Sequence, residues 1–66
     1  MEKIAIRDFY NRIIGYIETD SKGNKTVRDW RNVIQGYYYK SDDTTRDFYR
    51  RIIAKGDQTG MLIKNN

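Results

Sequence analysis

The chain has 66 residues, and its 13 lysines and arginines outnumber nine aspartates and glutamates, which gives a net charge of +4. It contains no cysteine and no histidine, which excludes disulfides, thiolate metal sites and the usual acid–base residue of neutral pH. We therefore expect a protein that is not an enzyme and that holds no metal or cofactor. A chain this short predicts one domain, residues 1–66, that buries only about 60% of the surface of its unfolded form.

Apolar runs are short throughout the chain, and none approaches the roughly 18 residues that a membrane-spanning helix requires. Residues 1–3 lead directly into patterned sequence and not into the apolar core of a signal peptide. Charges of both signs are interspersed along the chain, which is typical of a solvated surface. We expect a soluble, cytoplasmic protein with no membrane contact.

One sequence unit is written three times. Residues 7–16 read RDFYNRIIGY, residues 28–37 read RDWRNVIQGY and residues 46–55 read RDFYRRIIAK, with starts 21 and 18 residues apart. Short internal repeats bury their apolar surface by stacking on one another. The sequence therefore predicts three repeated supersecondary units, at about residues 4–20, 25–41 and 43–57.

Each unit is predicted to be a β-hairpin. Two β-rich arms surround the turn-forming run Asp20–Asn24, and the run Tyr37–Tyr39 has the composition of a strand. Gly15 and Gly36 lie inside the units, where each would destabilise a helix by about 1 kcal/mol. We expect an all-β antiparallel meander of six or seven strands, open or rolled. Its strands are expected at residues 3–8, 12–19, 25–29, 33–40, 44–47, 51–55 and, at the C-terminal end, within residues 60–64 as Met61–Lys64.

A helical alternative rests on the third unit. Thr44 and Asp47 resemble a helix-capping pair, and Phe48, Ile52 and Ile53 fall on one helical stripe. The alternative is a small α or α+β fold with helices at the repeat units.

The turns of the repeat are predicted from aspartate and asparagine. An aspartate at the first position of a turn accepts backbone N–H bonds, and asparagine tolerates the left-handed conformation that a three-residue hairpin with a bulge needs at its last position. The structural turn residues expected on this basis are Asp8, Asp29 and Asp47 at the first position and Asn11 and Asn32 at the last. Arg50 occupies the last position in the third unit and suits it less well.

Two-residue alternation predicts an apolar face with a small residue in the middle of each unit. In the first unit this face carries Ile13, Gly15 and Ile17. We expect an aromatic residue of each turn to fold back over the small residue of its unit, namely Phe9 over Gly15, Trp30 over Gly36 and Phe48 over Ala54. Since no further element is predicted to cover the apolar face, we expect a homodimer to complete the fold.

The repeated Arg-Asp-Phe-Tyr-x-Arg-Ile unit resembles small, mostly uncharacterised bacterial and mobile-element proteins in which Arg-Asp-Phe-Tyr-Gly-Arg-Ile recurs. The resemblance covers roughly residues 6–57. This chain departs from the pattern with Asn11, Asn32 and Arg50 in place of the glycine, and with Trp30-Arg31 in place of Phe-Tyr. A glycine fits the left-handed turn position. The resemblance implies a bacterial or phage setting and brings no activity with it.

Aromatic and arginine side chains are the candidate functional residues. The expected partner or dimer interface comprises Ile14, Tyr16, Trp30, Tyr37, Tyr38 and Tyr39, and the expected rim for a phosphate or a protein partner comprises Arg12, Arg31, Arg50 and Arg51. Tyrosine, tryptophan and arginine dominate the binding energy of protein interfaces.

The leading hypothesis is therefore a non-enzymatic, homodimeric protein-binding module, such as a phage- or mobile-element-encoded inhibitor or adaptor that acts on a host protein. The alternative is a small basic β-sheet protein that binds nucleic acid by stacking bases on its aromatic rings.

Overall fold

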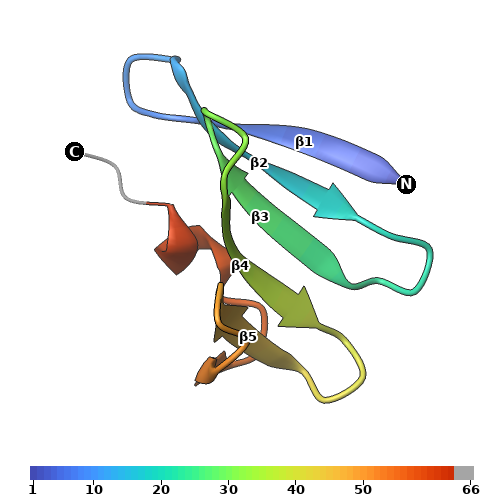
Figure 1. The fold of residues 1–66 in the computed structure, drawn as a ribbon. Helices are drawn as coiled ribbons and strands as arrows, with labels where there is room; N and C mark the ends of the chain where they lie inside the picture. Colours follow the sequence, from blue (N-terminus) through green and yellow to red (C-terminus); the bar gives the residue numbers. More distant parts are fainter. Residues whose placement is uncertain (64–66) are drawn as a thin grey trace.

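The computed structural model describes residues 1–63, which form a six-stranded antiparallel sheet with a short helix on one face (Figure 1). Each strand pairs with its neighbours in sequence, in the order β1-β2-β3-β4-β5-β6. The strands are β1 (Glu2–Arg7), β2 (Ile13–Thr19), β3 (Lys25–Asp29), β4 (Ile34–Tyr39), β5 (Thr44–Asp47) and β6 (Ile52–Lys55). The all-β meander is confirmed as an open sheet, and the helical alternative is wrong because the third unit forms the strand pair β5–β6.

Each repeat unit turns at the predicted place. In the first unit the N–H of Asp8 donates to the carbonyl of Arg12 at 2.9 Å, and the N–H of Asn11 donates back to the carbonyl of Asp8 at 3.0 Å. The last turn residue is left-handed in all three units, with φ of 66° at Asn11, 70° at Asn32 and 67° at Arg50. Asparagine adopts this conformation readily, whereas it costs most other L-residues about 1–2 kcal/mol.

A bulge follows each of these turns. Ile6 pairs with Gly15 while the adjacent Arg7 pairs with Ile13, so the returning strand β2 contains one extra residue. The same register shift recurs between Val27 and Arg28 and between Thr45 and Arg46. The bulges interrupt the strict alternation expected of the returning strands. The continuous apolar face predicted from that alternation is therefore not formed, and Ile13 is exposed while Gly15 is buried.

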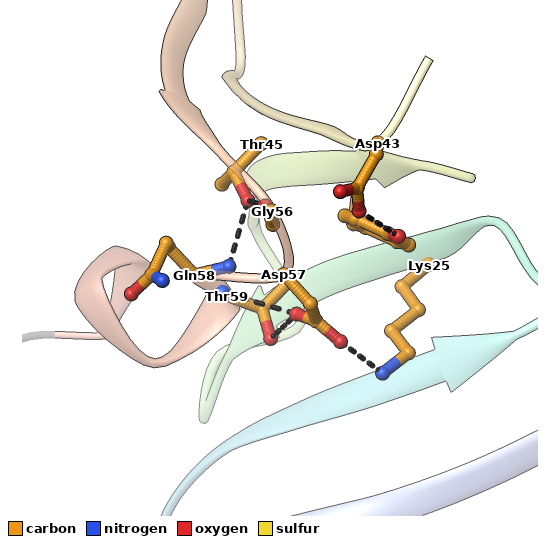
Figure 2. A network of polar contacts seen from close by, with 8 residues as sticks. Lys25, Asp43, Thr45, Gly56, Asp57, Gln58 and Thr59 are labelled. Atoms are coloured by element: carbon orange, nitrogen blue, oxygen red, sulfur yellow. Dashed lines mark hydrogen bonds and ion pairs between the residues drawn. The ribbon is translucent and has the colours of Figure 1, made fainter. Parts of the chain in front are cut away.

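The chain after β6 forms a 3-10 helix, η1 (Thr59–Leu62), and not the strand expected at Met61–Lys64; Lys64 lies outside the described residues. Gly56, with φ of 79°, turns the chain at the end of β6. The buried hydroxyl of Thr45 then donates to the Gly56 carbonyl at 2.7 Å and accepts the N–H of Gln58 at 2.9 Å (Figure 2). These bonds direct the chain over the sheet instead of along its edge. No helix within residues 1–63 has the length and apolarity needed to cross a membrane.

The end of η1 covers the sheet at two glycines. A Cβ atom added to Gly36 would lie 2.7 Å from Leu62, and one added to Gly15 would lie 2.7 Å from Ile63. Leu62 and Ile63 thus occupy the space that the turn aromatics were expected to fill. We call these two residues the lid. The core beneath is thin, and its fully buried side chains are Val27 and Thr45.

The expected folding back of the turn aromatics is wrong. Phe9 is 90% exposed, Trp30 65% and Phe48 55%. The lid fills the space above Gly15 and Gly36, so Phe9 and Trp30 remain in solvent. The argument that the sheet has no cover within its own chain is therefore also wrong.

We predict that Gly36→Ala destabilises the fold. Besides the lid, its Cβ would meet the carbonyl oxygen of Arg46 at 2.5 Å, a backbone atom that cannot move away cheaply. We expect the free energy of unfolding in urea to fall by about 1–3 kcal/mol, as for overpacked cores. Gly60→Ala is the matched control, because no atom lies within 4 Å of its added Cβ. Equal losses in the two variants would contradict the role of Gly36 beneath the lid.

Candidate functional site

The three repeat turns lie at one end of the sheet, because the β1–β2, β3–β4 and β5–β6 connections of a meander share that end (Figure 1). We define the turn end as residues 7–13, 28–34 and 46–53. Its sequence contains all seven arginines and three of the nine acidic residues of the chain, and none of the six lysines. The charge of the turn end is therefore +4, which equals the net charge of the whole protein.

Exposed apolar side chains concentrate at the same end. Of the 12 large hydrophobic residues exposed within residues 1–63, nine belong to the turn end. They are Phe9, Tyr10, Ile13, Trp30, Val33, Phe48, Tyr49, Ile52 and Ile53. Clustered exposed apolar residues mark interaction sites more often than scattered ones do.

The arginine that precedes each turn aspartate stabilises the turn. We call Arg7, Arg28 and Arg46 the inner arginines. Their Nη1 groups donate to the carbonyl of the left-handed turn residue, at 2.9 Å in the first unit, 3.2 Å in the second and 3.3 Å in the third. Arg28 also forms an ion pair with Glu18, and Arg46 with Asp42. The inner arginines therefore fasten the turns to the sheet.

The turn aspartates use both carboxylate oxygens. Oδ1 of Asp8 accepts the N–H of Tyr10 at 2.8 Å and that of Arg12 at 2.9 Å. Asp29 and Asp47 accept the equivalent pairs of N–H groups at 2.8–3.0 Å. In each of the three, the N–H four residues along the chain is the largest cause that lowers the pKa of the carboxyl below its ordinary value. The other carboxylate oxygen, Oδ2, accepts a hydrogen bond from a second arginine.

These second arginines are Arg12, Arg31 and Arg51, which we call the outer arginines. The Nε groups of Arg12 and Arg51 each donate to the Oδ2 of their aspartate at 2.9 Å, and Arg31 donates to Asp29 through Nη2 at 3.1 Å and Nε at 3.3 Å. Their side chains are 62–72% exposed. Each guanidinium also lies over an aromatic ring of the same turn, at 5.0–5.6 Å from the ring centroid. These rings belong to Tyr10, Trp30 and Tyr49.

The interface residues predicted from the sequence do not form one surface. Trp30 lies at the turn end, whereas Tyr38 is buried, and its hydroxyl donates to Oδ1 of Asp43 at 2.6 Å. This hydrogen bond, together with burial, raises the pKa of Tyr38 to about 12. The other predicted interface residues, Ile14, Tyr16, Tyr37 and Tyr39, are half-buried.

The predicted rim residues Arg12, Arg31, Arg50 and Arg51 all lie at the turn end. The sequence reasoning missed the four exposed aromatics Phe9, Tyr10, Phe48 and Tyr49. These aromatics directly follow the turn aspartates in two of the three repeats. Because turn tips are solvent-exposed, the sequence could have predicted their exposure.

The acidic groups of the turn end are engaged within the chain. Within residues 1–63 there is no group of three or more acidic residues placed to hold a metal ion. The three turn carboxylates are occupied by N–H groups and arginines. What the surface presents outward is guanidinium groups, aromatic rings and aliphatic side chains.

We predict that Asp29→Asn lowers the stability of the fold and weakens its dependence on acid. Because folding lowers the pKa of Asp29, its stabilising contribution is complete above the ordinary value of about 3.9 and is lost as the pH falls toward the lower folded value. Urea unfolding between pH 7 and pH 3 checks this. We expect the wild type to lose stability below about pH 4 and Asp29→Asn to lose less. Parallel curves would contradict the prediction.

Comparison of the chain with protein-family models, curated proteins and solved structures found no match. The resemblance to bacterial and mobile-element repeat proteins stays an expectation. The function is therefore argued from the turn end itself.

Proposed function

We propose that the protein is a non-enzymatic binding module that engages another protein through its turn end. The observation that carries this proposal is the segregation of all seven arginines with nine of the 12 exposed large hydrophobic residues. Protein interfaces are enriched in aromatic residues and arginine and depleted of lysine. The turn end has this composition, including the absence of lysine.

Three features favour a protein over a nucleic acid as the partner. The exposed aliphatic residues Ile13, Val33 and Ile52 suit apolar contacts with another protein. The turn end interleaves three aspartates with its seven arginines, so it is not the strongly basic patch typical of nucleic-acid-binding proteins. The tyrosine rings on the strands each have a cation over the ring, which reduces the area open to base stacking; the pairs are Tyr16 with Lys3, Tyr37 with Arg50 and Tyr39 with Arg46.

The charge of the turn end argues for a partner of a different kind from the chain itself. Two copies meeting through this surface would oppose a charge of +4 with another +4, which is unfavourable. An acidic protein surface would be complementary. A small adaptor or inhibitor of a host protein in the cytoplasm fits this surface, because such a protein acts by binding alone.

We predict that Trp30→Ala weakens partner binding about 30-fold or more while leaving the fold intact. Trp30 is 65% exposed, so its removal should cost well under the roughly 3–5 kcal/mol that a buried aromatic costs. An exposed interface tryptophan commonly contributes about 2 kcal/mol or more to binding. Urea unfolding measures the first effect, and cross-linking in the cells that make the protein measures the second.

For the cross-linking, a photoreactive amino acid replaces Phe48 at the turn end, and the matched control replaces Lys22 at the opposite end of the sheet. We expect one protein product from position 48, none from position 22, and loss of the product in Trp30→Ala. A nucleic acid as the product, or unfolding of Trp30→Ala, would refute the proposal.

The homodimer expected from the sequence stays a separate prediction. If it forms, like charge disfavours the turn end as its contact. Sedimentation velocity should therefore give the same mass for the wild type and for Trp30→Ala. A lower mass for the variant would place the turn end in a self-contact instead.

A further inference from the structure

Each outer arginine is held in a fixed orientation before any partner arrives. For Arg12 and Arg51, the aspartate holds Nε and the ring of Tyr10 or Tyr49 supports the guanidinium plane. Their terminal NH2 groups have no hydrogen-bond partner within residues 1–63. Such an arginine loses little conformational freedom when a two-oxygen anion binds to the remaining edge of the guanidinium.

The middle turn reaches the same arrangement with a different order of residues. In the outer two turns the aromatic is two residues and the arginine four residues after the aspartate, whereas Trp30 and Arg31 directly follow Asp29. Despite this change, Arg31 still binds the Asp29 carboxylate and lies over the Trp30 ring. The unit that recurs at the surface is thus an aspartate, an exposed arginine and an aromatic ring, which we call the arginine cluster.

The three arginine clusters are spaced by the sheet. Neighbouring strands lie about 4.8 Å apart, so consecutive hairpins place their turns about 10 Å apart, along a line bent by the twist of the sheet. Seven residues of an α-helix rise about 10.5 Å, which matches this spacing.

We infer that the turn end is a three-site receptor for carboxylates spaced about 10 Å apart on an acidic helical segment of a partner protein. This inference rests on the proposed function and names the chemistry of the partner. Each outer arginine takes one carboxylate through two parallel hydrogen bonds. The exposed Ile13, Val33 and Ile52 beside the clusters contact apolar side chains between the carboxylates.

The test uses two synthetic helical peptides of equal composition and calorimetric titration of the full chain. One peptide carries a glutamate at every seventh residue, and its isomer carries the same glutamates side by side. We expect the wild type to bind the spaced peptide about tenfold or more tightly than the isomer. The triple variant Arg12→Lys, Arg31→Lys and Arg51→Lys keeps the charge but loses the planar fork, and should lose that preference.

Lys22→Arg is the control, because Lys22 lies in the turn after β2, at the end of the sheet opposite the turn end, and this variant should keep wild-type affinity. Far-UV circular dichroism verifies that each variant is folded. Equal binding of the two peptides, absence of binding, or an unaffected triple variant would overturn the inference but not the broader proposal, which the cross-linking tests separately. Tighter binding of an oligothymidylate than of either peptide would overturn both.

Discussion

The carboxylate at the start of each tight turn is the interaction on which this structure depends. One oxygen of Asp8, Asp29 or Asp47 accepts two backbone N–H bonds, and the other holds an exposed arginine. Asp20 accepts two N–H bonds in the same manner at the opposite end of the sheet, where Gly23 supplies the left-handed residue. Because the same group shapes the turn and aims the arginine, the architecture and the proposed binding surface have one physical origin.

Very few residues form the core of the single sheet and cover it. Val27 and Thr45 form the centre of the core, and the lid covers Gly15 and Gly36. The hydroxyl of Thr45 fixes the chain that leads to the lid, and the ion pair of Lys25 with Asp57 supports it further (Figure 2). Polar side chains thus stabilise the edge of this core, a role that additional apolar residues have in larger domains.

Local chemistry allowed the strands and turns to be predicted from the sequence. Aspartate at the first turn position and asparagine at the left-handed one specify a hairpin without reference to the rest of the chain. The lid could not be predicted, because it depends on room above glycines that are far from Leu62 and Ile63 in sequence. The bulges changed which side chains of the returning strands share a face, and strict alternation in the sequence did not predict them. The gathering of the arginines, by contrast, was visible in the sequence once arginine and lysine were counted separately.

Arg50 holds a left-handed backbone conformation that asparagine fills in the other two repeat turns. This less favourable conformation lowers the free energy needed to open the hairpin of β5 and β6. Thr45 belongs to that hairpin, so local opening there also frees the tether of the lid. Opening of the β5–β6 hairpin and release of η1 are therefore coupled in one cooperative event.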